Sequence, residues 1–379
     1  AAARCRDFLL AKIAEVKKPK TNVQKVQEYV LLRFKFLMDF CNRHAPEVAG
    51  EITQAYVDTM GKMLLSVFRT YHSSLAKHMQ TMATKDDLLA VLQTATKSLF
   101  GSKSDPSSRL NAFALGERGA ILEDVEAPPV IAHVVSAEKT KLPYESIFRS
   151  VQRHLLDSAT SEYLFTREFF GRKPGKAVFL QVFARTLSQC LENVENHLFS
   201  CFDGTALLLM IHVTHDHRML MQSRRVPVLD SYFDRVNMLL WPRFKVVFDM
   251  NLESVKTADT KKLGPIELQP HFVMRRFSEF SATVLSLHRS LQARGMSDDM
   301  LMHNMTILRD EVCGLLDRMS MEHAIPMLRS VFLITNFDAF CSLHEERRLS
   351  GTDEFAHFDD RLKRQIGVFV EEVLREPFG

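Results

Sequence analysis

Residues 226–291 decide the fold: VPVLDSYFDRVNMLLWPRFKVVFDMNLESV fills 226–255, and PHFVMRRFSEFSATVLSLHRSL fills 270–291. Apolar side chains recur in both parts at steps of three and four residues, which places each set on one face of an α-helix. The first set is Leu229, Phe233, Val236, Leu240, Phe244 and Val247, and the second is Val273, Phe277, Phe280, Val284, Leu287 and Leu291. The stretch therefore predicts two amphipathic helices, each burying an apolar face.

Pro242 lies inside the first of these patterns. A proline removes one backbone donor and clashes with the carbonyl four residues earlier, so we expect a kink or a restart near residues 239–241. The single tryptophan stands beside it. Six residues are expected in the structural core: Trp241, Phe244, Phe277 and Phe280 in this stretch, and Phe183 and Leu187 in a similar apolar stripe earlier in the chain.

The composition is that of a globular protein, with 46% hydrophobic and 25% charged residues. Only 14 glycines and 13 prolines occur in 379 residues, which favours long helices with few connections. A net charge of +3 argues against a nucleic-acid binder. The six cysteines are scattered and form no C-x-x-C pair, which is typical of buried thiols in a reducing compartment. The longest apolar run, at 206–211, is far shorter than a membrane span of about 20 residues.

Similar stripes continue along most of the chain and predict an all-α protein, an elongated stack of helical bundles. At about 150 residues per domain, two or three units are expected. We divide the chain into an N-terminal helical bundle at 1–100, an extended connector at 101–142, a central helical bundle at 143–262 and a C-terminal helical bundle at 263–379.

Three local expectations accompany this division. Residues 85–100 are apolar enough for a short helix. The hydrophilic run GSKSDPSSR predicts a mobile connector tip near 102–108, and APPVIAHVV allows a strand at 130–135 because residues before proline avoid the helical region.

Candidate chemistry is sparse. GRKPGK at 171–176 resembles a phosphate-binding loop, but only three residues separate its glycines and Ala177 follows the lysine, so an interhelix turn is favoured. His212 and His215, in the run H-x-x-H-D-H, share a helix face and could bind a metal. No glutamate occupies the general-base position of a zinc protease, so solvent-facing polar residues explain the run better. We predict no catalytic, cofactor-binding or metal-binding residue.

Pairs of basic residues recur, and adjacent residues on a helix point about 100° apart, so one member of each pair is expected at the surface. The candidates for contact with an anionic membrane or an acidic partner are Arg275, Arg276, Arg224 and Arg225. Glu279 lies three and four residues after the first pair, so a purely structural salt bridge is the alternative.

Several short motifs also carry a resemblance. They are LLWPRF, MNLESV, PHFVMRRFSEFSA, FLLAKI, KKPKTN, YVDTM, KDDLLAV, ALGERG, YLFTREFF, LITNFDAF and EPFG. These motifs are spread along residues 8–379. Together, and in their order along the chain, they resemble the vacuolar protein sorting-associated protein fifty-two family. Its members are subunits of the Golgi-associated retrograde protein (GARP) tethering complex and belong to the CATCHR group of helical rods.

The resemblance implies a non-enzymatic subunit that tethers vesicles during retrograde transport from endosomes to the trans-Golgi network and promotes SNARE-mediated fusion. It implies as partners the other three GARP subunits, the related endosomal EARP complex, SNARE proteins, and Rab- and Arf-like small GTPases. The protein would contact vesicle and trans-Golgi membranes peripherally, from the cytosol, at the cytoplasmic face of the trans-Golgi network and endosomes. No cofactor and no nucleic acid is implied.

Two alternatives stay open. The chain could be a helical scaffold of another tethering complex, of the exocyst or conserved oligomeric Golgi type, or a metal- or nucleotide-dependent enzyme using His212 and His215 or the 171–176 turn. The chain begins in what reads as mid-helix, without a methionine, so we expect a fragment that lacks an N-terminal assembly region and a final bundle.

Overall fold

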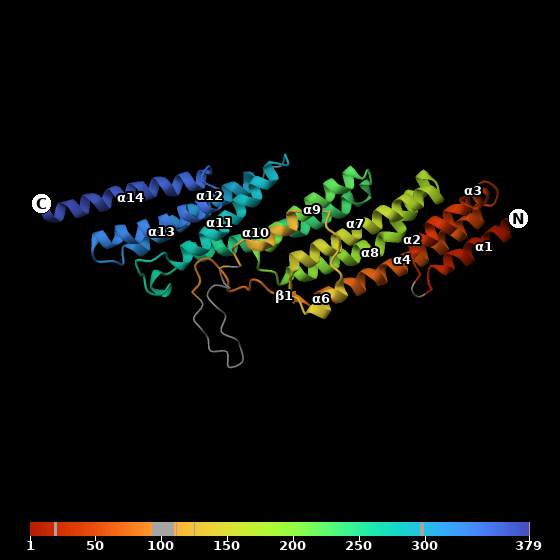
Figure 1. Cartoon of the computed structure of the whole chain (residues 1–379), viewed down its shortest axis with the longest axis horizontal. Coiled ribbons are helices and arrows are strands. Elements are labelled where there is room, and N and C mark those ends of the chain that lie inside the picture. The colour runs from red at the N-terminus through yellow and green to blue at the C-terminus, as the bar shows by residue number, and fades with distance from the viewer. Residues whose placement is uncertain (19–20, 93–109, 111, 125, 296–298, 379) are drawn as a thin grey trace, which may run out of the picture. The chain divides into compact units, whose positions relative to one another are not determined.

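The computed structural model describes residues 1–18, 21–92, 110, 112–124, 126–295 and 299–378. Almost all of its elements are helices, which confirms the all-α class (Figure 1). A parallel pairing of two two-residue strands, β1 (Met79–Gln80) and β2 (Leu142–Pro143), is the exception among the described residues. Contacts group the described chain into two compact units, which we call unit 1 (residues 1–80, 124–200 and 213–240) and unit 2 (residues 81–123, 201–212 and 241–379).

Unit 1 is built around α4, the 31-residue helix Pro46–Ala76, which packs against four helices of ten or more residues. These are α1 (Ala2–Glu15), α3 (Lys35–His44), α7 (Tyr144–Phe169) and α8 (Arg172–Phe199) (Figure 1). The short elements α2 (Val23–Val26), the π-helical η1 (Gln27–Leu31) and the 3-10 turn η2 (Leu32–Phe34) lead into α3, and α6 (Ala132–Glu138) packs on α4.

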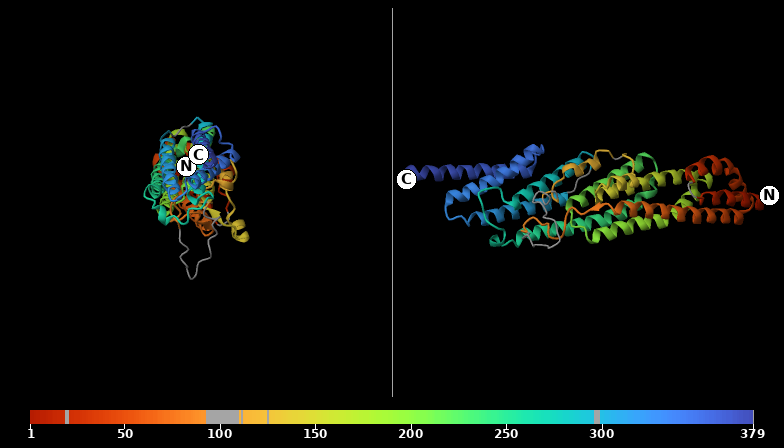
Figure 2. Two further views of the ribbon diagram at one scale, coloured as in Figure 1. Left: turned by 90° about the vertical axis from the view of Figure 1, so that its left-hand side faces the viewer. Right: turned by 60° about the horizontal axis from the view of Figure 1, so that its bottom comes forward.

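Unit 2 is built around α13 (Pro326–Glu346), which packs against α11 (Phe272–Gln292), α12 (Asp299–Ser320) and α14 (Asp353–Phe378). Both figures show α14 lying along α13 (Figures 1 and 2). The 3-10 turns η3 (Gly116–Leu122) and η5 (Thr260–Lys262) also belong to unit 2. Two helices, α9 (Gly204–Ser223) and α10 (Asp230–Lys256), contribute residues to both units, and the 3-10 turn η4 (Pro227–Leu229) lies between them in sequence.

Aromatic rings fill the two cores. In unit 1, Phe179 and Phe183 stack with ring centroids 4.7 Å apart, and Tyr163 meets Phe179 edge-on. In unit 2, Phe277 of α11 lies 5.8 Å from Phe340 of α13 and 6.0 Å from Phe358 of α14. These rings are almost completely buried, so the periodic stripes read from the sequence are the faces that join neighbouring helices.

Two local expectations are corrected, and a third is settled in part. Pro242 lies inside α10, so the helix does not restart there, while the expected kink stays a prediction. The residue four positions earlier, Met238, is 73% exposed, so water can reach the backbone that proline leaves unpaired. Residues 132–138 form helix α6 rather than a strand. Residues 85–92 are not helical, and the rest of that expected helix, together with the predicted tip at 102–108, lies outside the described residues. The four-segment division stays a prediction.

Candidate functional site

A non-helical segment, Leu88–Val91, is held in unit 2 by a buried arginine. Arg276 of α11 is 6% exposed, and its Nη1 donates to the backbone oxygens of Leu88 at 2.6 Å and Val91 at 2.9 Å. The guanidinium also lies 4.7 Å from the ring of Phe272. A planar cation with several donors suits this role, because it satisfies two carbonyls that no helix pairs.

The same segment is bonded by the end of α10. The side-chain oxygen of Asn251 accepts from the backbone N–H of Leu89 at 3.0 Å, and its amide nitrogen donates to the oxygen of Val247 at 2.9 Å. Ser254 Oγ accepts from the N–H of Ala90 at 3.3 Å. We call the set of Asn251, Ser254 and Arg276, with the segment Leu88–Val91 that they bind, the strap clamp.

Residues 113–118 of unit 2 are also held by side chains from other elements. Thr283 Oγ1 donates to the oxygen of Phe113 at 2.9 Å. Arg118 and Asp203 form an ion pair of 2.7 Å in which both side chains are less than a tenth exposed. Asp203 also accepts from the N–H of Ala206 and so caps the start of α9. An ion pair this buried is costly to form, and the helix cap supplies its second hydrogen bond.

The strap clamp gives a structural role to several of the motifs that carry the family resemblance. MNLESV supplies Asn251 and Ser254, and PHFVMRRFSEFSA supplies Arg276. The segment that they bind belongs to KDDLLAV, and ALGERG supplies Arg118. KDDLLAV, MNLESV and PHFVMRRFSEFSA therefore meet in the strap clamp, whereas Arg118 of ALGERG forms the separate ion pair with Asp203. Sequence reasoning did not identify these roles.

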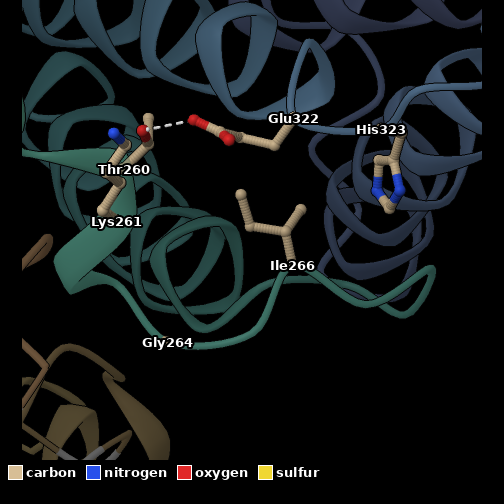
Figure 3. Close-up of a pocket in the computed structure, with 6 residues that line it drawn as sticks. All are labelled: Thr260, Lys261, Gly264, Ile266, Glu322 and His323. Carbon is tan, nitrogen blue, oxygen red and sulfur yellow. Dashed lines mark hydrogen bonds between the residues drawn. The ribbon is translucent and has the colours of Figure 1, made fainter.

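The loop between α10 and α11 carries two hollows that share Gly264. One, of about 280 Å³, is lined by Thr260, Lys261, Gly264, Ile266, Glu322 and His323. Figure 3 shows Ile266 between the side chains of Thr260 and His323, and Thr260 Oγ1 donates to Glu322 at 2.9 Å. The second, of about 210 Å³, is lined by apolar residues such as Leu92, Pro265 and Phe272, and by the exposed Arg275.

The far end of this loop is anchored on α13. The side-chain oxygen of Asn336 accepts from the N–H of His271 at 2.8 Å, and Thr335 Oγ1 donates to the oxygen of Leu268 at 2.8 Å. Burial lowers the pKa of His271 to about 4, so its ring is neutral at pH 7 and Nδ1 can accept the N–H of Val273 to cap α11. The motif LITNFDAF thus fixes one wall of the second hollow.

The four predicted contact residues are placed differently from one another. Arg276 belongs to the strap clamp, and its burial removes it from the surface contact expected of it. Arg275, its neighbour, is exposed. Glu279 lies 4.0 Å from Arg347 rather than pairing with either arginine. Arg224 is half-buried and binds Asp157 at 3.0 Å.

Arg225 is exposed and ends α9 in the left-handed region, with φ of +58°. The N–H of Arg225 donates to Gln222 at 2.9 Å, and the N–H of Val226 donates to Met221 at 3.0 Å, which is the Schellman arrangement that usually carries glycine. Arg348 ends α13 in the same way, also with φ of +58°. The RRV and RRL sequences are therefore helix ends.

The predicted core residues lie as follows. Phe183, Phe244, Phe277 and Phe280 are each at most 4% exposed. Trp241 and Leu187 are half-buried. The ring of Trp241 meets that of Phe244 edge-on at 6.0 Å.

The GRKPGK run begins α8, and its second glycine has a packing role. A Cβ added at Gly175 would lie 2.3 Å from the backbone oxygen of Thr166 in α7. Gly171, just before α8, has φ of +93°. The close turn between α7 and α8 requires both glycines. The GRKPGK run therefore forms the interhelix turn that its sequence favoured.

His212 and His217 are buried in α9, and His215 is half-buried. Burial lowers the pKa of His217 to about 3. Within the described ranges, no group of three or more His, Cys, Asp or Glu side chains is placed to hold a metal ion. Among the helices of the described chain, none has the length and apolar character that crossing a membrane requires.

A buried carboxyl group in unit 1 was missed by sequence reasoning. Tyr56 Oη donates to Glu162 at 2.6 Å, and Gln27 Nε2 donates to both of these side chains at 2.8 Å. Burial raises the pKa of Glu162 to about 7, and the two hydrogen bonds only partly offset this. Tyr56 belongs to YVDTM and Glu162 directly precedes YLFTREFF, so proximity to these motifs was the available signal.

Comparison with known proteins gives matches along most or all of the chain. A family model described as "Vps52, C-terminal" matches residues 58–370. Vacuolar protein sorting-associated protein 52 A of Arabidopsis thaliana is 39% identical over the whole chain, which covers 52% of that protein. The homologues of Homo sapiens and Caenorhabditis elegans are 35% and 30% identical, again over the whole chain, which covers 52% and 55% of them. The chain thus spans about half the length of the curated relatives it matches.

Proposed function

Because the chain belongs to the Vps52 family, we propose that it acts as a non-enzymatic subunit of a vesicle-tethering complex. The names of its relatives place them in vacuolar protein sorting. The single observation that carries the proposal is similarity over the whole chain to such proteins, from plants to animals. The bonding of the strap clamp supports it, because these polar side chains bind backbone groups and act in assembly of the fold.

The proposed setting is retrograde transport from endosomes to the trans-Golgi network, at the cytoplasmic face of these membranes. The proposed partners are the other three GARP subunits, the endosomal EARP complex, SNARE proteins, and Rab- and Arf-like GTPases. The subunit would promote SNARE-mediated fusion by holding these partners and the two membranes close together. Several weak contacts on one scaffold add through effective concentration, without a tight site on any of them.

The helical architecture suits such a scaffold. Helix α4 has 31 residues and is therefore about 46 Å long. We propose that the bundles form an elongated stack, which small-angle scattering tests directly: an elongated particle is expected, and a compact spherical particle would contradict the proposal.

Affinity capture of the full-length protein from cells tests the complex. The expected result is recovery of the three other GARP subunits, and of the EARP-specific subunit from endosomal fractions. Recovery of exocyst or conserved oligomeric Golgi subunits instead would reject the assignment. Elemental analysis of the purified chain addresses the rival enzyme, because stoichiometric zinc would contradict a purely scaffolding role.

A further inference from the structure

Residues 17–44 of unit 1, which end with α3, carry an unusual concentration of positive charge, and four of their seven basic residues lie in the part from α2 to α3. Residues 17–44 contain seven Lys or Arg and only two Asp or Glu, whereas the whole chain has a net charge of only +3. Without this segment the chain would be slightly acidic. The charge is therefore local, and a local basic surface attracts anionic partners.

Burial defines an outer face of this segment. Gln27, Leu31, Met38 and Cys41 are at most 3% exposed and form the inner ridge. Residues two positions from a buried helical residue point to nearly the opposite side, at about 160–200°. The residues so placed are Lys25, Tyr29, Arg33, Phe36 and Arg43, all of them exposed, and we call them the outer face.

Two large rings on this face are left in solvent. Tyr29 is 70% exposed and Phe36 is 59% exposed, although their neighbours on the inner ridge are covered. The rings are seven residues apart, or about 10 Å along the segment. Tyr29 lies in the π-helical turn η1, a distortion of a kind that is often found at functional sites.

The cations between and beside the rings are unpaired. Among the residues that the structure describes, Lys25, Arg33 and Arg43 make no ion pair, while Lys35 on the side of the segment binds Glu168 at 3.0 Å. Two acidic residues border these groups: Glu28 is next to the buried Gln27, and the exposed Asp39 is next to Met38 and two positions before Cys41. The outer face therefore bears three basic residues and two aromatic rings, with Asp39 at its edge.

We propose that the outer face binds an anionic membrane surface, with Tyr29 and Phe36 inserted between lipid headgroups and Lys25, Arg33 and Arg43 on their phosphates. A partner helix would need a continuous apolar stripe, and Arg33 interrupts it here. Separate rings flanked by cations are typical of segments that lie on a membrane interface. Aromatic rings also prefer the headgroup region.

This inference deepens the membrane contact proposed above and assigns it to a surface that the basic pairs of the sequence did not indicate. It can fail separately from the proposed function, because capture of the tethering subunits does not depend on lipid. The test is vesicle co-sedimentation of the full chain with phosphatidylcholine vesicles containing 30 mol% phosphatidylserine, compared with pure phosphatidylcholine vesicles. We expect binding only to the former, weakened by 0.5 M salt.

Two variants separate charge from insertion. Arg33→Glu/Arg43→Glu should weaken binding at least about 30-fold, since each basic residue near anionic lipid contributes about five-fold. Tyr29→Ser/Phe36→Ser should weaken it about ten-fold by removing the inserted rings. The matched controls are Lys173→Glu/Lys176→Glu, an equal charge change on exposed positions of α8, and Met238→Ser, which removes an exposed apolar side chain elsewhere. Both controls should bind like the parent chain.

A Phe36→Trp reporter gives an independent readout, because its emission should shift to shorter wavelength with phosphatidylserine vesicles. Failure of the parent chain to bind these vesicles would overturn the proposal. Unchanged binding by both outer-face variants would also overturn it. So would a loss of self-association or of protein capture in these variants with vesicle binding intact, because the face would then be a protein interface.

Discussion

A buried polar set in each unit has a different role. In unit 1, Gln27, Tyr56 and Glu162 bond to one another between helices, as Gln152 does to Tyr232 at 2.7 Å. In unit 2, Arg276 and Asn251 bond to the backbone of a segment that has no helix of its own. The first set therefore fixes the register of helices, and the second replaces missing secondary structure.

This difference predicts that unit 1 is most sensitive where helix backbones touch. Gly175→Ala should destabilise the protein by at least about 4 kcal/mol, because the new Cβ would lie 2.3 Å from the oxygen of Thr166 and backbone must move. Gly50→Ala in α4 is the control, since nothing lies within 4 Å of its added Cβ, and it should stabilise by about 0.5–1 kcal/mol. Urea unfolding followed by circular dichroism measures both. Equal stability of the two variants would show that the α7–α8 turn can relax.

The stability of unit 2 should depend instead on the strap clamp. Arg276→Met keeps the volume of the side chain but leaves the oxygens of Leu88 and Val91 without their donor, which should cost about 3 kcal/mol. Arg275→Met changes the exposed neighbour and should stay within about 0.5 kcal/mol of the parent. The same unfolding experiment compares them. A smaller loss for Arg276→Met than for Arg275→Met would contradict the strap clamp.

The carboxyl group in unit 1 predicts a pH dependence. The folded pKa of Glu162, about 7, is above its ordinary value of 4.5, so folding favours the protonated form and the unfolding free energy falls as pH rises through this range. Between pH 5 and pH 7 the loss should be about 2 kcal/mol. Glu162→Gln removes the titrating group and should lack this part of the pH dependence. If the unfolding free energies of the parent chain and Glu162→Gln change in parallel with pH, the Glu162 carboxyl group is not held neutral in the folded state.

The smallest effect concerns a helix end. Arg225→Gly should stabilise the protein by about 1 kcal/mol, because glycine adopts the positive φ of this Schellman turn without strain. Arg224→Gly, at a position one residue earlier, should destabilise by a similar amount through loss of the Asp157 contact and of helix propensity. Thermal unfolding distinguishes a rise from a fall in midpoint. If Arg225→Gly destabilises the protein, the Arg225 side chain contributes more stability than its positive φ costs.

Periodicity predicted the helices that bury a stripe on a neighbour, such as α8 and α11, because core packing imposes the three- and four-residue spacing itself. It failed at Lys85–Leu92, where apolar residues occur but the backbone groups are bonded by Asn251, Ser254 and Arg276 instead of by a helix. Those partners lie more than 150 residues away in sequence, so no local pattern reveals them.

The same limit applies to single residues. Arg275 and Arg276 are indistinguishable by type and neighbourhood in the sequence, yet one is exposed and the other is buried on two carbonyls. Residues 132–138 combine β-branched residues with a preceding Pro-Pro pair, yet the extended conformation ends at Ile131, the N-cap residue of α6. The helix packs on α4, a contact that local propensity does not reveal.

Hydrogen exchange at the Leu89 amide tests the strap clamp most directly, because this N–H donates to the side chain of Asn251 although it belongs to no helix. We expect slow exchange in the parent chain and in Arg275→Met, and fast exchange in Arg276→Met while the amides of α4 and α8 stay protected. Exchange of Leu89 at the rate of a free peptide in the parent chain would contradict the account.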